Sequence, residues 1–215
     1  MRFPVVNFLE WEPTYEQILK DFKWPRENDE KAARLLSKLV GDSTAPPEIL
    51  EETIRGKSVL VVGPAAPKFS GDFDSVICAG SAASVLRAAK IVPDILVTDL
   101  DGDVEDQILL NKLGALAVVH AHGDNVDALR RWAPEFTGRM LATMQAAPLP
   151  NVYNFGGFTD GDRSVCIAAH FGAKHIAVTG FDFEHPVGFS KNIEIKKKKL
   201  AWAKRILEKF EISYF

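Results

Sequence analysis

The residues best suited to chemistry lie in the acidic segment VTDLDGD, residues 97–103. Asp99, Asp101 and Asp103 recur at every second position, and side chains two residues apart in an extended chain point the same way. Carboxylate oxygens are ligands that Mg²⁺ prefers, together with phosphate and water. We therefore expect Asp99 and Asp101 to hold this ion, with Gly102 letting the chain turn close to a ligand. Asp103 is expected to cap the helix that follows, and capping is the alternative for the whole segment.

A second polar segment, HAHGDN at residues 120–125, also follows an apolar run. We expect Asp124 to join the metal site and His122 to bind phosphate or substrate. A zinc site on His120 and His122 is the alternative, but no third nitrogen or sulfur ligand lies nearby in the sequence. Asn125 is expected either to cap the next helix or to bind substrate.

The glycine-rich segment FGGFTDGDR, residues 155–163, is expected to bind phosphate. Thr159 or Asp160 would cap the following helix, whose first amide groups favour an anion. Arg163 would pair with a phosphate through two parallel hydrogen bonds. The segment is neither a Walker A motif nor a dinucleotide fingerprint. Its residues expected at the nucleotide are Gly156, Gly157, Thr159, Asp160 and Asp162.

Two earlier loops and a lysine run complete the candidate residues. The loops VVGPAAPK and CAGSAAS would bring backbone amides, and one lysine, against a nucleotide; ordinary connecting loops are the alternative. The residues concerned are Gly63, Pro64, Lys68, Gly80 and Ser81. Four consecutive lysines, residues 196–199, favour a solvated helix face. Because they spread around the helix, the alternatives are that one or two point inward to a polyphosphate, or that the run contacts nucleic acid or an acidic partner.

Apart from the lysine run, all of these candidate segments lie at the ends of predicted strands. From Lys57 onward, short apolar runs alternate with stretches that suit helices, which predicts an α/β fold with a mainly parallel sheet and flanking helices. Ligands bind at the carboxyl ends of such strands. The runs expected as strands are SVLVVG, SVICAG, DILVTD, ALAVVHAH, MLATM, NVYNF and HIAVTG.

Residues 1–56 have a different pattern. YEQILKDF and NDEKAARLLSKLV place apolar residues at helical spacing, so we expect a helical N-terminal extension. It would either form a homodimer interface or pack on the sheet. Residues 57–215 would form the catalytic domain, which closes with a long basic helix.

Bulk composition narrows the class of protein. The chain has 215 residues, 26% of them charged, and a net charge of −3, so nothing draws it as a whole to nucleic acid or to a membrane surface. No apolar run suits a membrane span or a signal peptide, and the cytoplasm is the expected location. Cys78 and Cys166 are expected as reduced core residues. No serine nucleophile motif is present, which favours metal and phosphate chemistry over covalent catalysis.

The strings VVGPAAP, PDILVTDLDGD, HAHGDN, NFGGFTDGDR and GFDF, in this order over roughly residues 57–183, resemble the archaeal 6-hydroxymethyl-7,8-dihydropterin pyrophosphokinase family. The catalytic part of that family is similar to that of thiamine pyrophosphokinases. The resemblance implies Mg²⁺-dependent transfer of diphosphate from ATP to a pterin alcohol, with release of AMP.

In that mechanism Asp99, Asp101 and Asp124 would hold Mg²⁺, and Arg163 with a lysine would stabilise charge on the transferred group. Asp124 or His122 would orient the attacking hydroxyl. The residues guessed for the pterin are Phe155 and Phe158, with Asp160 or Asp162. The alternatives are a thiamine pyrophosphokinase, a nucleotide-sugar glycosyltransferase that uses an Asp-x-Asp pair, and a nucleotide-binding regulator without activity.

Overall fold

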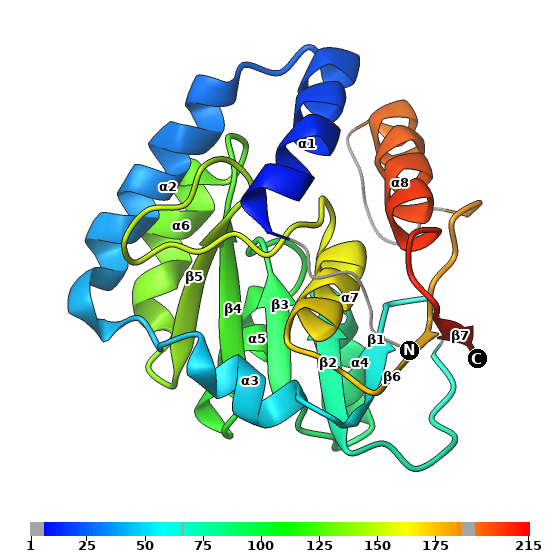
Figure 1. Cartoon of the computed structure of the whole chain (residues 1–215). Coiled ribbons are helices and arrows are strands. Elements are labelled where there is room, and N and C mark those ends of the chain that lie inside the picture. The colour runs from blue at the N-terminus through cyan, green and yellow to red at the C-terminus, as the bar shows by residue number, and fades with distance from the viewer. Residues whose placement is uncertain (1–6, 66, 186–191) are drawn as a thin grey trace.

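A seven-stranded parallel sheet forms the centre of the fold (Figure 1). The computed structural model describes residues 7–65, 67–185 and 192–215. Neighbouring strands all run parallel, which confirms the predicted α/β class, and their order is β5-β4-β3-β2-β1-β6-β7. The strands are β1 (Ser58–Val62), β2 (Ser75–Ala79), β3 (Ile95–Thr98), β4 (Leu116–Ala121), β5 (Met140–Met144), β6 (His175–Thr179) and β7 (Ser213–Tyr214).

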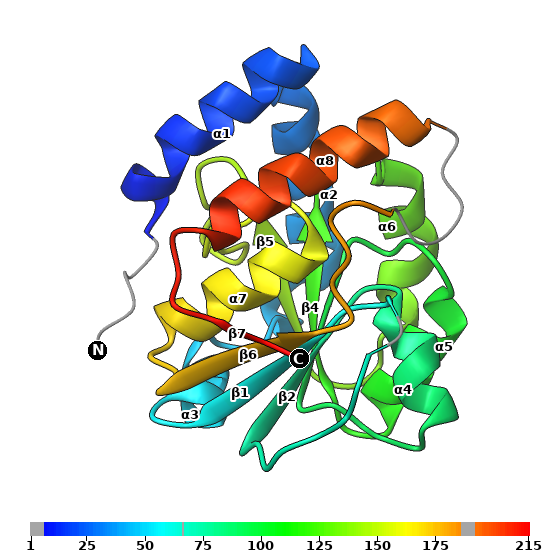
Figure 2. The same ribbon diagram turned by 90° about the vertical axis from the view of Figure 1, so that its right-hand side faces the viewer.

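Helices cover both faces of the sheet (Figure 2). Helices α4, α5 and α6 lie on one side, while α7 packs against β1, β2, β3 and β6 on the other, with α8 outside α7. Because both faces are covered, the strands are almost continuously apolar; all six residues of β4 are buried. The helices are α1 (Phe8–Phe22), α2 (Arg26–Val40), α3 (Glu48–Ile54), α4 (Ala82–Ala88), α5 (Val104–Lys112), α6 (Val126–Trp132), α7 (Asp160–His170) and α8 (Ile193–Leu207), with short 3-10 turns at Gly41–Ser43 and Ala133–Glu135.

The N-terminal segment is helical, as predicted. Its first helix begins with a capping box in which the Asn7 side chain and Glu10 satisfy each other's backbone amides. Tyr15, Ile18 and Leu36 are fully buried in the same apolar core as the strands. One core therefore joins the N-terminal helices to the sheet. Residues 1–6 of the predicted extension lie outside the described residues.

Two segments differ from the strand predictions. NVYNF, residues 151–155, is not a strand, because the chain turns back tightly between Leu149 and Val152 and only Tyr153 bridges β5, at Thr143. The side chain of Asn154 then bonds the Ala146 carbonyl. The C-terminal tail, in contrast, contributes the edge strand β7 beside β6.

The other expectations about the core are confirmed. Cys78 and Cys166 are both buried free thiols, and burial raises the pKa of each.

In the described part of the chain, no helix combines the length and apolarity needed to cross a bilayer.

The strand order creates a crevice between β1 and β6. The chain proceeds from β1 through β2 to β5 in one direction and then returns to place β6 on the other side of β1. Such a reversal marks the usual ligand crevice of open α/β sheets. Gly63 follows β1 and Gly180 follows β6, and a Cβ on Gly63 would lie 2.4 Å from the Gly180 carbonyl oxygen. The two loops therefore approach as closely as glycine allows.

Candidate active site

A cavity at the carboxyl edge of the sheet contains most of the predicted site residues. The predicted site residues that line it come from the ends of β1, β2, β3 and β4 and from the start of α7. They are Gly63, Pro64, Gly80, Ser81, Asp99, Asp101, His122, Thr159 and Asp160. The cavity therefore lies at the carboxyl ends of the strands, where such sheets bind ligands.

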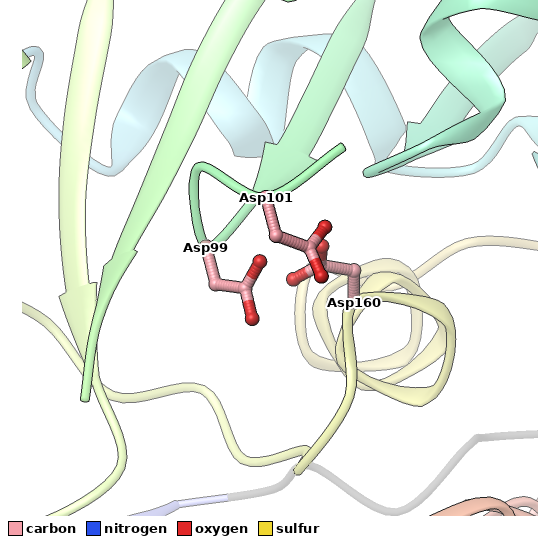
Figure 3. Close-up of side chains that lie close together, drawn as sticks. All are labelled: Asp99, Asp101 and Asp160. Carbon is pink, nitrogen blue, oxygen red and sulfur yellow. The ribbon is translucent and has the colours of Figure 1, made fainter. Parts of the chain in front are cut away.

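Three carboxylates converge in this cavity (Figure 3). Asp99 and Asp101 follow β3, Asp160 is the first residue of α7, and one oxygen of each lies within 4.8 Å of the others. In the described residues this is the one group of three or more acidic, histidine or cysteine side chains spaced for a metal ion. Three carboxylate oxygens suit a hard cation such as Mg²⁺.

Asp99 and Asp101 converge for a reason that differs from the predicted one. Strand β3 ends at Thr98, so the two aspartates are not on extended chain. Leu100 between them has a φ of 65°, a left-handed conformation that is uncommon for a leucine. The Thr98 hydroxyl accepts the Leu100 amide at 2.8 Å, and Gln107 donates to the Asp101 carbonyl at 2.7 Å. A tight hydrogen-bonded turn, not strand alternation, therefore aims both carboxylates at one point.

Asp160 takes the place in the cluster that was predicted for Asp124. The Arg163 guanidinium holds it, with Nη1 donating to Asp160 Oδ1 at 3.0 Å and Nη2 donating to the Phe158 carbonyl at 2.9 Å. Gly80 leaves the room, since a Cβ there would lie 2.4 Å from Asp160 Oδ2. Asp124 is exposed and belongs neither to the cavity lining nor to the carboxylate cluster.

The other residues of the glycine-rich loop hold Asp160 and the start of α7 in place, and several of them do not line the cavity. Arg163 is buried behind Asp160 and does not line the cavity, so its geometry does not suit the predicted contact with phosphate. A Cβ on Gly157 would lie 2.3 Å from Arg163 Cα. Asp162 accepts hydrogen bonds from the Thr159 amide and hydroxyl, at 2.9 and 2.6 Å, at the start of α7. Gly156, Gly157 and Asp162 do not line the cavity either.

The loop after β4 orients Asp99. His122 lies 3.2 Å from Asp99 Oδ2 through Nε2, while its Nδ1 accepts the Asp124 amide at 3.3 Å. This pattern requires the tautomer in which Nε2 carries the proton. Asn125 donates to the carbonyls of Asp99 and His120 at 2.8 and 2.7 Å, so it ties the ends of β3 and β4 together instead of capping α6. Only the backbone of Asp124 takes part.

Asp103 was predicted to cap a helix, and His120 with His122 formed the alternative zinc site. Asp103 caps α5, as predicted, by accepting the Asp106 amide at 3.3 Å. His120 is buried with Nδ1 3.1 Å from the Thr143 hydroxyl, and burial together with the charge of Arg163 lowers its pKa. No described group of metal-binding side chains includes either histidine, so the zinc alternative has no support.

Electrostatics in the cluster favour a bound cation. Burial alone would raise the pKa of Asp99, but the hydrogen bond from His122, with the charges of Arg163 and Lys199, lowers it to about 2. The ionised Asp99, and then burial, raise the pKa of Asp101 to about 6. Burial and the charge of Asp99 raise the pKa of Asp160. Asp99 Oδ1 is buried without a hydrogen-bond partner among the described residues. A divalent cation would relieve both the repulsion and this unsatisfied oxygen.

Helix α8 provides the cations of the cavity. Lys196, Lys199, Leu200 and Ala203 recur at helical spacing and all line it. The two lysines between them point elsewhere: Lys198 lies 3.0 Å from Asp21 and Lys197 lies 4.0 Å from Glu194. The periodicity of the helix therefore divides the four-lysine run into two pairs. The predicted alternative Lys68 is exposed and outside the lining.

Several lining residues were missing from the sequence prediction. Gln145 directly follows β5, so the strand-end rule could have found it. Trp24 follows α1, and nothing in its neighbourhood along the chain signals a site. Of the two phenylalanines guessed for the pterin, Phe158 lines the cavity, whereas Phe155 packs on His170 and Phe171.

Fold and site together define an α/β protein with a carboxylate cluster and lysines around one cavity, a design suited to a phosphorylated ligand. The chain belongs to the family described as 6-hydroxymethylpterin diphosphokinase MptE-like, whose model matches residues 72–188. A relative from Pyrococcus furiosus is 42% identical over 94% of both chains. One from Methanocaldococcus jannaschii is 34% identical over 97% of this chain and 99% of the relative. Both are named 6-hydroxymethyl-7,8-dihydropterin pyrophosphokinase.

Proposed function

We propose that this protein transfers diphosphate from ATP to the hydroxymethyl group of 6-hydroxymethyl-7,8-dihydropterin and releases AMP. Relatives that match it over nearly the full length carry the name of this pyrophosphokinase. The observation that carries the proposal within this structure is the cluster of Asp99, Asp101 and Asp160 in the same cavity as Lys196 and Lys199. Opposite charges placed in this way suit a metal-bound polyphosphate.

The three carboxylates would hold Mg²⁺, which supplies charge neutralisation on the phosphates when bound. The alcohol oxygen attacks the β-phosphorus and releases its proton to solvent. The bond between this phosphorus and the oxygen that bridges it to the α-phosphorus breaks, and AMP keeps that oxygen. Diphosphate is thereby transferred and AMP leaves. Reactions of this class depend mostly on positioning and on stabilising charge.

Each neighbouring side chain then has a defined task. Lys199 and Lys196 would stabilise the charge on the transferred diphosphate. His122 would hold Asp99 in place; it is not the base, because both of its ring nitrogens are already engaged. Arg163 would hold Asp160 from the buried side. Asp124 has no part in this scheme, in contrast to the mechanism drawn from the sequence.

The purified chain should be incubated with ATP, Mg²⁺ and 6-hydroxymethyl-7,8-dihydropterin, and nucleotide and pterin products measured by chromatography and mass spectrometry. We expect AMP and the pterin diphosphate in equal amounts. ADP as the product would show single phosphoryl transfer and contradict the proposal. Turnover of thiamine but not of the pterin would indicate a thiamine pyrophosphokinase, and release of a nucleoside diphosphate from a nucleotide sugar would indicate a glycosyltransferase. ATP binding without turnover of any acceptor would indicate a regulator.

A further inference from the structure

The cavity has two unlike ends, and the strand order separates them. Asp99 follows β3, which lies between β4 and β2 in the sheet. On one side of it, β4 and β5 contribute His122 and Gln145 to the lining. On the other side, beyond β2, β1 and β6 contribute Gly63 and Gly180. The carboxylates therefore have lining residues on both sides of them, so two ligands that meet there have room at different ends of the cavity.

The first of these, the glycine end, consists of Gly63, Gly180 and Phe181. It lies at the crevice where the strand order reverses, the usual nucleotide position in open parallel sheets. Gly63 and Gly180 both line the cavity without a side chain, each leaving room for the backbone of the other loop, and Phe181 packs beside Gly63 and Gly161. A phosphate chain can come closer to the backbone of these two glycines than to residues with side chains.

The second, the aromatic end, consists of Phe22, Trp24 and Phe158; Trp24 lies between α1 and α2, and α2 packs on β4 and β5. Trp24 and Phe158 both line the cavity, with ring centroids 6.2 Å apart and planes inclined by 48°. Phe22 stacks on Trp24 at 4.4 Å and lies 5.5 Å from Phe158. The Lys199 ammonium lies 5.4 Å from the centre of the Trp24 ring. This end therefore offers aromatic surface next to a cation that faces the carboxylates.

Contacts between α1 and α8 hold Trp24 in position, and the two helices run side by side in Figure 2. The Asp21 carboxylate accepts a hydrogen bond from Trp202 Nε1 at 2.8 Å and pairs with Lys198 at 3.0 Å. The Lys198 ammonium also lies 4.8 Å from the centre of the Phe22 ring. The Trp24 amide donates to the Leu19 carbonyl at 3.0 Å. The chain that carries the indole is thus attached to α8 through the side chains of Asp21 and Phe22.

We propose that Trp24 and Phe158 form the surface against which the pterin ring lies, while the glycine end takes the nucleotide. The inference rests on the proposed function and adds the direction from which each substrate enters. A pterin is a flat heteroaromatic ring, and such rings stack on aromatic side chains much as nucleobases do. The carboxylates then lie between the two substrates, where diphosphate is passed from one to the other in line.

The test is a comparison of KM values for the two substrates in Trp24→Leu and Trp24→Phe. We expect Trp24→Leu to raise the KM for the pterin about tenfold or more and to leave the KM for ATP within about twofold, by analogy with the loss of stacking on a base. Trp24→Phe should keep most of the affinity, because an aromatic face remains. Phe181→Leu should do the reverse and raise the KM for ATP. Phe73→Leu, an aromatic residue that packs on Phe215 and lines neither this cavity nor the turn around Asp101, is the matched control.

If a variant turns over too slowly for its KM values to be measured, pterin binding is measured directly instead. Calorimetry with 6-hydroxymethylpterin should show weaker binding to Trp24→Leu than to the wild type, with thermal denaturation used to verify folding. An unchanged pterin affinity in Trp24→Leu, or a rise in the KM for ATP instead, would overturn the inference. Failure of the wild type to turn over ATP with the pterin would instead overturn the proposed function, so the two failures are distinct.

Discussion

The carboxylate cluster and the aromatic end of the same cavity are built in different ways. Asp99, Asp101 and Asp160 are held by hydrogen bonds inside the sheet domain, through Thr98, His122 and Arg163 among others. Trp24 comes from the N-terminal helices and depends on contacts with α8, at the other end of the chain. The carboxylates are thus fixed by the core of the fold, whereas the surface proposed for the acceptor includes a residue held by a contact between two peripheral helices.

The largest effect is expected from Asp160→Asn, compared with Asp124→Asn. Loss of one carboxylate from a catalytic metal site should lower kcat about a thousandfold, since several kcal/mol of barrier are involved. Asp124→Asn should change kcat by less than about twofold, because a surface substitution away from the site has little effect. Steady-state assays with saturating Mg²⁺ measure both. A comparable loss in both variants would return Asp124 to the site.

The second largest effect is expected from Lys199, which lines the cavity with the carboxylates and also lies beside the Trp24 ring. Lys199→Met keeps the aliphatic stem but removes the charge, and we expect kcat to fall about a hundredfold, as for loss of one group that stabilises transition-state charge. Lys197→Met, two residues away on the other side of α8, should stay within about twofold because it removes only a solvated charge. Equal losses would mean that the general charge of the helix matters and not the position of one side chain.

A smaller effect is expected where α1 contacts α8. Asp21→Asn keeps the size of the side chain but removes its charge beside Lys198. We expect the KM for the pterin to rise about threefold with kcat nearly unchanged, because exposed ion pairs contribute little individually. Asp127→Asn removes a surface ion pair with Arg130 on α6 and serves as the control. A fall in kcat without a change in KM would mean that this contact supports the chemistry and not the acceptor.

The smallest effect is a pH dependence of stability without metal. In the folded protein the pKa of Asp101 is raised to about 6 and that of Asp160 is also raised, so the folded state binds protons more tightly than the unfolded state does. Without metal, these two groups should therefore destabilise the fold as the pH rises through about 6 and cease to do so toward pH 4. Mg²⁺ should accordingly raise Tm more at pH 8 than at pH 5.

Asp101→Asn provides the control for this titration. Because it removes one of the repelling charges, its metal-free Tm should exceed that of the wild type at pH 8, and the difference should shrink at pH 5. Thermal denaturation with and without Mg²⁺ at the two pH values measures both quantities. A Mg²⁺ shift that is independent of pH in the wild type would contradict the carboxylate cluster as the binding site.

The fold was largely predictable because strong local patterns encode it. Apolar runs of strand length alternate with helix-like stretches, and a sheet covered on both faces makes such runs nearly continuous. The exceptions were weak local signals. NVYNF has the composition of a strand but folds back after one bridge, and the short tail EISYF pairs only because β6 offers a free edge.

The site was predictable only in part, for a similar reason. The strand-end rule placed Asp99, Asp101 and His122 correctly in the cavity, since the carboxyl ends of parallel strands share one edge. It could not choose between Asp124 and Asp160, because both follow a predicted strand and precede a helix. That choice depends on Gly80 and Arg163, which make room for Asp160 and hold it.

The sequence by itself determined the class of fold, the edge of the sheet that carries the chemistry and the resemblance to a family, because each depends on residues close together in the chain. Tertiary structure decided three other matters: the third carboxylate, the lysines that face the cavity, and the place of Trp24. Trp24 lies far from the other lining residues in the sequence and reaches them because α1 contacts α8 and α2 packs on β4 and β5. Contacts between distant segments depend on the packing of the whole core, and no local pattern of residues encodes them.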